Sequence, residues 1–285
     1  MASTQGGDAP QESPDPQPTR DPEHAVDESD DADGEFVALQ KTLSQKRRAA
    51  KDSPESRLHK AFPFPFLPNV RPLTISDYDA CVELENAAFH NPEHRASPEK
   101  ACHTPHLFAY RLTTCPELSL GLFCTVIPEQ VKGWTIETLA SAKPVETDRA
   151  DKAVSVLLAH AVSTKCCGQT ITDEDMGVPK EWRKLGGRSA DVGNQESGRT
   201  IAWHSLAVSP RLQGCGLGQM IVKAYLQQMN NSGLADRVSL ICQDYLVSYY
   251  ERFGFTHIGK SQARFGGGGW HDMSLELSGP PKTPF

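Results

Sequence analysis

The sequence lacks any run of about 20 consecutive apolar residues, the length that a membrane-spanning helix needs. Its start is acidic and rich in proline, so it lacks the basic and apolar regions of a signal or transit peptide. The eight cysteines include no Cys-x-x-Cys pair, which argues against a zinc site and against a disulfide framework. From these absences we expect a soluble, cytoplasmic protein without a metal site or membrane contact, whose thiols are small, reduced core residues.

Basic residues are nearly missing from the first 35 positions, where eleven acidic side chains accompany a single arginine. Such a segment cannot bury enough apolar surface to offset the entropy lost on ordering, so we predict that it is disordered. Residues 36–60 reverse the sign, with seven basic side chains against two acidic ones. We therefore expect a tail over residues 1–60, a folded domain over 61–279 and a short tail over 280–285. The net charge of −7 comes mostly from the first tail, and the near-neutral domain argues against a nucleic-acid-binding groove.

The stretch from Trp203 to Met220 predicts a strand, a glycine-rich turn and a helix. A period of two places Thr200, Ala202, His204, Leu206 and Val208 on one face of the strand, and Ile201, Trp203, Ser205 and Ala207 on the other. Both faces are mostly apolar, which is typical of a central strand. The glycines at 214, 216 and 218 let the backbone approach a ligand, and the following helix begins with free N–H groups. This arrangement predicts an anion site.

Apolar periodicity elsewhere predicts an α/β domain of about 210 residues. The expected strands cover residues 116–125, 154–164, 200–208, 237–242, 255–259 and 273–277, and helices are expected after Ser76, before residue 114, over 217–231 and over 245–253. We expect Ser76 to cap the first helix with Asp79 three residues later, and Glu85 to share a face with its apolar residues. In the strand over 154–164, Val154, Val156, Leu158, His160 and Val162 should lie on one face. The polar segment 168–198 indicates a surface insertion loop.

Two nucleotide-binding motifs do not fit the glycine turn. A Walker loop needs Lys and then Ser or Thr after its last glycine, whereas this chain has Gln219 and Met220. A dinucleotide fingerprint needs Gly-x-Gly-x-x-Gly at the first strand of its unit, whereas here the third glycine comes one residue early and the turn lies late in the chain.

The run from Val208 to Gly218, with Gln213, Gly216 and Gly218 in their spacing, resembles the acetyl-CoA turn of the GCN5-related N-acetyltransferase superfamily. The segment CQDYLVSYYERFGF at 242–255 is similar to the closing helix of that superfamily. The segment CPELSLGLF at 115–123 is similar to the substrate-side strand of the arylalkylamine (serotonin) N-acetyltransferase family. The resemblance spans residues 71 to 277. It implies a single acyl-CoA N-acyltransferase-type domain with a mixed central sheet flanked by helices.

The resemblance also implies roles for individual residues. The cofactor acetyl-CoA would be held by Leu206, Ala207 and Val208 along its arm and by Gln213, Gly214, Cys215, Gly216, Leu217, Gly218 and Gln219 around its pyrophosphate. Tyr250 matches the family's general acid to the CoA sulfur. His204 matches one of two relay histidines, but the other position here is Ala202, so the relay is incomplete. Phe89, Pro116 and Leu118 would line the slot for the amine.

Other residues could supply the base. An alkylamine with a pKa of about 10.4 is protonated at pH 7, and freeing it costs roughly 4–5 kcal/mol. His160 could replace the missing relay partner if its strand neighbours that of His204, although ordinary core packing is the alternative. Glu85 and Glu93 are further candidates for the base, with a solvated surface role as the alternative for Glu93.

We therefore expect an acetyl-CoA-dependent N-acetyltransferase acting on an arylalkylamine or similar small amine, and a monomer. A polyamine or protein-amine acetyltransferase is one alternative, and a catalytically weak CoA-binding regulator is another. The basic tract at 46–54, with Ser53 before Pro54, is loosely similar to a phosphorylation-dependent docking segment, and a solvated linker is the alternative.

Overall fold

The computed structural model describes residues 56–57, 60, 68–89, 104–131, 140–145, 151–184 and 191–279. All of them belong to one compact unit that spans Ala50–Phe285. The predictions for the acidic tail, for the docking segment at 46–54, for Glu93 and for the C-terminal tail lie outside the described residues. Within the described ranges, no helix combines the length and apolar character that crossing a membrane would take.

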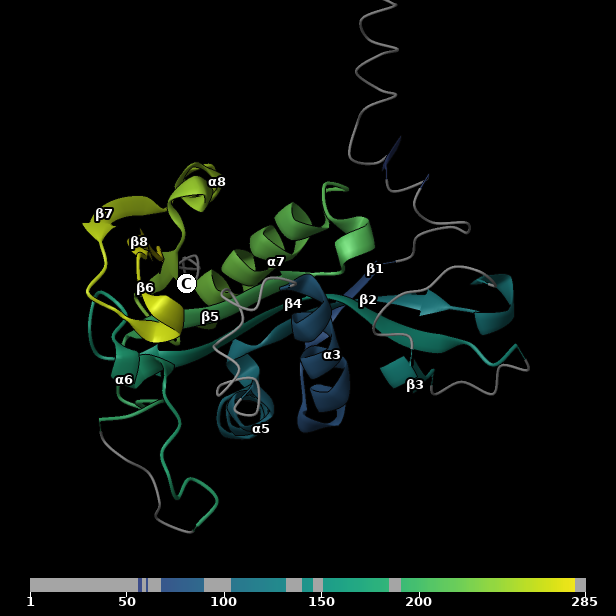
Figure 1. The fold of residues 1–285 in the computed structure, drawn as a ribbon, viewed down its shortest axis with the longest axis horizontal. Helices are drawn as coiled ribbons and strands as arrows, with labels where there is room; N and C mark the ends of the chain where they lie inside the picture. The colour runs from purple at the N-terminus through teal and green to yellow at the C-terminus, as the bar shows by residue number, and fades with distance from the viewer. Residues whose placement is uncertain are drawn as a thin grey trace, which may run out of the picture. The chain divides into compact units, whose positions relative to one another are not determined.

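One mixed sheet of eight strands organises the domain, in the order β1-β2-β4-β5-β6-β8-β7, with β3 paired to β4 (Figure 1). The strands are β1 (Pro68–Pro72), β2 (Leu120–Val126), β3 (Lys143–Pro144), β4 (Val154–Cys166), β5 (Thr200–Val208), β6 (Arg237–Cys242), β7 (Thr256–Lys260) and β8 (His271–Glu276). The β5–β6 pair is parallel, and the other pairs are antiparallel. The mixed α/β class with a helix-flanked central sheet is confirmed.

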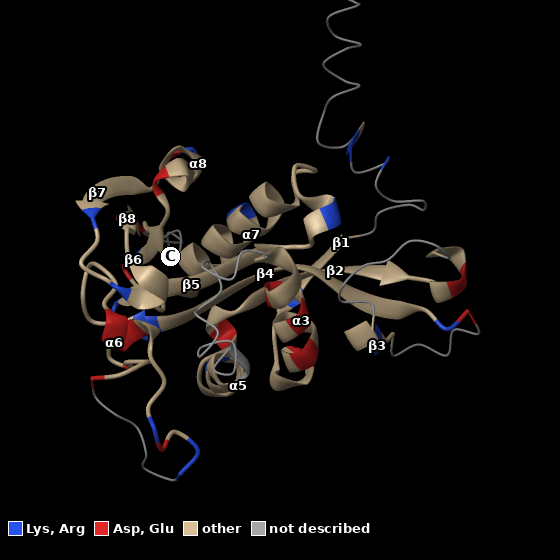
Figure 2. Ribbon diagram, viewed as in Figure 1, with Lys and Arg blue, Asp and Glu red and all other residues tan. Residues whose placement is uncertain are grey.

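Helices cover both faces of this sheet. The α-helices are α3 (Tyr78–Ala88), α5 (Thr104–Thr114), α6 (Asp173–Met176), α7 (Leu217–Ser232) and α8 (Val247–Glu251), and short 3-10 turns include η1 (Ile75–Asp77), η2 (Pro116–Leu118), η3 (Pro128–Val131), η5 (Pro210–Leu212), η6 (Asp244–Leu246) and η7 (Phe265–Gly267). Helices α3 and α5 pack on one face and α7 on the other, each over its own apolar core (Figure 1). Strands β2 and β5 carry no charged residue, whereas acidic residues mark α3 and α6 (Figure 2).

The sequence patterns located most of the helices and strands, but some of the predicted first and last residues differ from those in the structure. Strands β5 and β6 have the predicted bounds, and α7 begins at the predicted Leu217. The expected cap at Ser76 is wrong, because the capping box consists of Thr74 and Asp77. The buried Asp77 carboxylate accepts the Thr74 N–H at 3.0 Å and pairs with Arg71 at 2.8 Å, so these contacts determine where the chain turns into α3.

Two other expected elements differ in extent. The strand expected from Pro116 begins only at Leu120, because Pro116 starts the 3-10 turn η2. The segment expected to be a surface loop carries α6 and buries Ile171 and Met176 in a small core cluster.

Two β-bulges change which side chains share a face. In β4, Leu122 and Phe123 of β2 pair with Ala159 and Leu157, so Leu158 is an extra residue. The expectation that His160 shares a face with Val156 and Leu158 is therefore wrong. His160 instead contacts the ring of Phe108 on α5, with centroids 5.3 Å apart.

The bulge in β5 lies at His204. Val162 pairs with Ser205 and Ser163 pairs with Trp203, which leaves His204 without an opposite residue in β4. As a result, the hydroxyl of Ser205 reaches Glu85 on α3, and the ring of His204 reaches Met176 on α6. The simple alternation that placed Ser205 on the face opposite His204 is wrong for this part of the strand.

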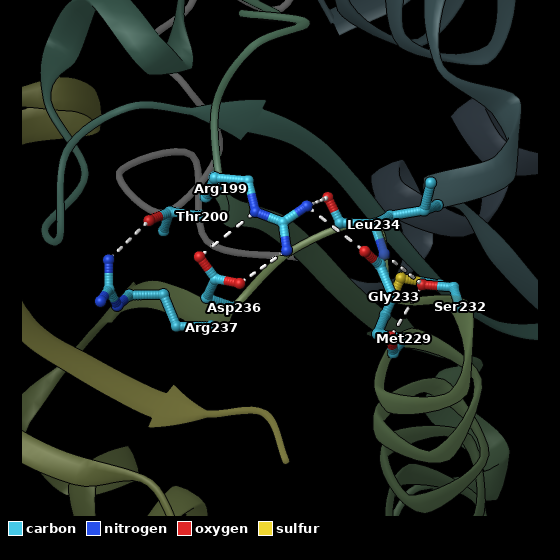
Figure 3. A network of polar contacts seen from close by, with 8 residues as sticks. All are labelled: Arg199, Thr200, Met229, Ser232, Gly233, Leu234, Asp236 and Arg237. Carbon is cyan, nitrogen blue, oxygen red and sulfur yellow. Dashed lines mark hydrogen bonds and ion pairs between the residues drawn. The ribbon is translucent and has the colours of Figure 1, made fainter. Parts of the chain in front are cut away.

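A polar network holds the starts of β5 and β6 together (Figure 3). Arg199 makes two bonds to the Asp236 carboxylate, at 2.6 and 3.2 Å, and donates to the carbonyl oxygens of Gly233 and Leu234, both at 3.3 Å. These contacts connect the end of α7 to the first residues of both strands. Because Arg199 and Asp236 are more than half exposed, the pair acts mainly by positioning the chain and adds little stability.

The buried hydroxyl of Tyr225 anchors α7 to the sheet. It contacts the Ser163 hydroxyl at 2.5 Å and donates to the Leu118 carbonyl oxygen at 3.2 Å. We expect Tyr225→Phe to lower the free energy of unfolding by about 1–3 kcal/mol, because it leaves buried polar groups without a partner. Urea unfolding measures this change. Tyr245→Phe is the control, since Tyr245 is 69% exposed, and equal losses in the two variants would contradict the anchoring role.

Candidate active site

A cavity of about 210 Å³ opens where β5 and β6 separate. The two strands are paired from Thr200–Trp203 to Arg237–Leu240, and past this point they have no pairing with each other. The cavity is lined by residues of β5, the end of β6, α3, α5 and α8. Because the two strands separate here, elements on both faces of the sheet contribute residues to the same cavity.

A cluster of three polar side chains forms the α3 side of the cavity. Ser205 donates to Glu85 Oε2 at 2.6 Å, and His160 Nε2 lies 3.0 Å from the same oxygen and 3.1 Å from Ser205 Oγ. Glu85 and Ser205 line the cavity, while His160 is fully buried behind them. Three different elements, α3, β4 and β5, thus hold one carboxylate at the cavity wall.

The tautomer of His160 follows from its surroundings. Nδ1 is buried and has no hydrogen-bond partner, so a proton on that atom would leave an unsatisfied donor. The geometry assigns a proton to Nε2, which donates toward Glu85 and Ser205. Glu85 Oε1 has no partner among the described residues and is the atom able to accept a proton from a bound ligand.

Tyr250 lies on the opposite wall. Its ring is 8% exposed, lines the cavity and packs edge-on against Trp203 and Phe255. Burial raises the pKa of Tyr250 above its usual value, with smaller contributions from neighbouring groups. The side chain therefore remains a neutral phenol, and its hydroxyl has no hydrogen-bond partner within the described part of the chain. It can donate a hydrogen bond to a group in the cavity.

His204 also lines the cavity, but both of its ring nitrogens already have neighbours. Nε2 lies 2.7 Å from Thr164 Oγ1 and Nδ1 lies 3.0 Å from Met176 Sδ. Burial, and then the charge of Arg111, lower the pKa of His204 well below 6.5. The ring is therefore neutral at physiological pH, and its assignment as a catalytic residue stays a prediction.

The glycine turn has the conformation that an anion cradle requires. Gly214 and Gly216 have φ angles of 74° and 88°, which favour glycine, and Gly216 immediately precedes α7. The first N–H groups of α7, at Leu217, Gly218 and Gln219, have no partner within the helix. Phosphate oxygens fit such an arrangement.

The rest of the expected cofactor site adjoins this turn. Gln213 donates from Nε2 to the Val208 carbonyl oxygen at 3.2 Å, and Cys215 is buried beneath the turn. Past Trp203, the β6-facing edge of β5 has no strand partner among the described residues, so the backbone of Leu206, Ala207 and Val208 can pair with an extended ligand. The cofactor assignments stay predictions that this geometry fits.

Only one of the three residues expected to line the amine slot lies at the cavity. Phe89 lines the cavity, whereas Pro116 and Leu118 do not, and Leu118 is fully buried in the core. The structure adds Leu107, Phe108 and Trp270 to the lining, which sequence periodicity alone could not bring together.

One basic residue at the glycine turn was missed. Arg57 Nη1 lies 3.5 Å from the Gly214 carbonyl oxygen. The clustering of basic residues at 36–60 was the available signal, but it did not indicate which residue meets the turn. A guanidinium at this place can add positive charge to the anion cradle.

Comparison with known proteins gives consistent matches. Residues 145–277 match the family model of the acetyltransferase (GNAT) domain. A serotonin N-acetyltransferase from Mesocricetus auratus is 33% identical over 148 residues, covering 52% of this chain and 50% of that protein. The serotonin N-acetyltransferase of Macaca mulatta is 30% identical over 88 residues, covering 31% of this chain and 43% of that protein. The chain thus spans half or less of the length of these curated relatives.

Among solved structures, the loading GNATL domain of CurA from Lyngbya majuscula aligns with a TM-score of 0.48 and 12% identity. The alignment covers 74% of this chain and 98% of that chain.

The environment of His204 predicts a pH dependence of stability. Because folding lowers its pKa, both states hold the ring neutral above about pH 6.5, and only the unfolded state takes up a proton below it. Stability therefore falls as the pH drops below 6.5, by at most about 1.4 kcal/mol per pH unit for this group. His204→Gln should lack this part of the decline in urea unfolding between about pH 5 and 8. If the free energy of unfolding of the wild type and of His204→Gln changed in parallel with pH, the lowered pKa of His204 would be contradicted.

Proposed function

We propose that this chain, whose residues 145–277 match the acetyltransferase (GNAT) domain, is an acetyl-CoA-dependent N-acetyltransferase acting on a small primary amine. One observation carries the proposal: the cavity between β5 and β6 holds a carboxylate on one wall and a neutral phenol on the other. Amine acetylation needs both a group that takes a proton from the nucleophile and a donor to the leaving group.

The glycine turn and the free edge of β5 are the parts of the chain that would hold acetyl-CoA. The N–H groups of Gly216 to Gln219, with Arg57 beside them, suit the phosphates, and the backbone of 206–208 suits the extended arm. Acetyl-CoA supplies an acetyl group activated as a thioester. In the overall reaction a C–N bond forms and the C–S bond breaks. The nitrogen of the ammonium form loses two protons: a base takes the first before the attack, and the CoA sulfur gains a proton as the second leaves.

Glu85 is the base that we assign to the first of these protons, the one carried by the ammonium. A lysine-like amine is almost fully protonated at pH 7, and its deprotonation costs roughly 4–5 kcal/mol without a base. Oε2 is held by Ser205 and His160, and Oε1 has no partner among the described residues. His204 is the alternative base, but its bonds to Thr164 and Met176 would have to be exchanged first.

Tyr250 is the donor that we assign to the leaving sulfur. The aromatic contacts with Trp203 and Phe255 restrict the ring, so the hydroxyl is held in place before the reaction. A phenol whose pKa is raised by burial keeps its proton until negative charge develops close to it.

The lining favours an arylalkylamine over a polyamine. Phe89, Leu107, Phe108 and Trp270 present apolar surface, and Glu85 is the one carboxylate in the described lining. A polyamine would need several acidic groups spaced along its chain. The similarity to the serotonin N-acetyltransferases supports the same choice.

A turnover assay with tryptamine and spermidine tests the function. We expect acetylation of tryptamine to exceed that of spermidine at least tenfold in kcat/KM, and Tyr250→Phe to lower kcat at least tenfold with little change in KM for acetyl-CoA. Tyr249→Phe, on the same helix but outside the cavity lining, is the control. Unchanged turnover in Tyr250→Phe would remove the acid role, and no transfer to either amine would count against the enzyme assignment.

Glu85→Gln tests the base. Without a carboxylate, turnover should depend on the fraction of free amine in solution, so kcat/KM should be at least 100-fold lower near pH 7 and should rise about tenfold per pH unit. Steady-state rates over a pH series measure this change. Glu83→Gln is the matched control, since Glu83 lies on α3 but not in this cavity. A pH profile of Glu85→Gln that overlays the wild type would transfer the base role to His204 or to bulk water.

A further inference from the structure

A second charged group, Arg111 on α5, lines the same cavity. The side chain is only 4% exposed and donates one hydrogen bond, from Nη2 to the Met176 carbonyl oxygen at 3.1 Å. Its Nε is buried without any hydrogen-bond partner. Within the described ranges, no carboxylate lies within ion-pair distance of this guanidinium.

An unpaired cation in such a position is costly. Burial lowers the pKa of Arg111 to about 10, although the negative charge of Glu85 acts in the opposite direction, so the group is still a cation at pH 7. Proteins usually pair a buried charge or satisfy all its donors. Here the protein keeps a charged guanidinium with unused donors at the wall of its proposed active site.

A purely structural role does not explain this arrangement. One bond to a backbone carbonyl could be made by a neutral donor such as glutamine, without burying a charge. The other buried side chains described on α5 carry no charge: Phe108 and Leu112 lie in the core of the α3 side, and the Tyr110 hydroxyl accepts the Asn194 N–H. Arg111 is therefore the one strongly basic group in a lining whose only described acidic group is Glu85.

We propose that the acceptor amine carries a carboxylate, that Arg111 binds this carboxylate and that Glu85 binds the amine. The inference rests on the proposed acetyltransferase function and narrows its substrate class to aromatic amino acids and related zwitterions. The guanidinium has N–H donors besides the one bonded to Met176, and two N–H groups of one guanidinium can match the two oxygens of a carboxylate. The apolar residues Phe89 and Trp270 then remain for the aromatic part of the substrate.

The contribution of the carboxylate is measured with two pairs of acceptors whose members differ only in this group. The pairs are tryptophan with tryptamine, and phenylalanine with phenethylamine. We expect wild-type kcat/KM to be higher for the amino acid in each pair. Arg111→Gln should lower kcat/KM about 10- to 100-fold more for the amino acids than for the amines, since a hydrogen bond to a charged group is worth about 1.5–3 kcal/mol. Arg111→Lys should restore part of the loss, because it keeps the charge without the fork.

A binding measurement separates failure of this inference from failure of the proposed function. Calorimetry with CoA present should show that N-acetyltryptophan binds more tightly than N-acetyltryptamine, and that Arg111→Gln removes the difference. Melting temperature and acetyl-CoA affinity confirm that the variant is folded. If no amine is acetylated but the Arg111-dependent difference persists, the carboxylate site stands and the enzymatic proposal falls. A wild type that prefers the amine in turnover and binds both products equally would overturn the carboxylate site, whether or not the variants fold.

Discussion

The site depends on a parallel strand pair that stops after four residues. Strands β5 and β6 are joined only from Thr200–Trp203 to Arg237–Leu240, and the contacts between Arg199 and Asp236 hold their first residues together. Backbone donors and acceptors beyond this point have no partner strand, which would be costly in a closed core. A bound extended ligand would satisfy them, and the same opening provides the cavity. The opening therefore accounts for both the proposed cofactor edge and the proposed acceptor site.

The β-bulges in β4 and β5 determine which side chains lie at the cavity. A regular β5 would direct Ser205 and His204 to opposite faces, and a regular β4 would direct His160 toward the α7 face. With one extra residue in each strand, Ser205 and His160 both meet Glu85 on α3. The polar cluster is therefore produced by irregularities in neighbouring strands, and its carboxylate faces a wall that also contains Arg111 and Tyr250.

Charge in the cavity is balanced within a small volume. Glu85 and Arg111 have opposite signs, and the other described residues of the lining are neutral. A ligand with one positive and one negative group would neutralise both, whereas a simple amine would leave the guanidinium without a partner. The low polarity that raises the pKa of Tyr250 strengthens such pairing, because charges interact more strongly away from water.

The sequence by itself determined the elements and the anion turn, because these depend on local rules. Apolar periodicity located β5 and β6, and the glycine spacing from 214 to 218 located the turn, each within a few residues of chain. The tertiary structure alone decided the chemistry of the cavity. Glu85, His160 and Ser205 are separated by up to 120 residues, and a single bulge reverses the face of every side chain after it. Periodicity cannot reveal a bulge, since bulges arise from pairing between strands that are distant in the sequence.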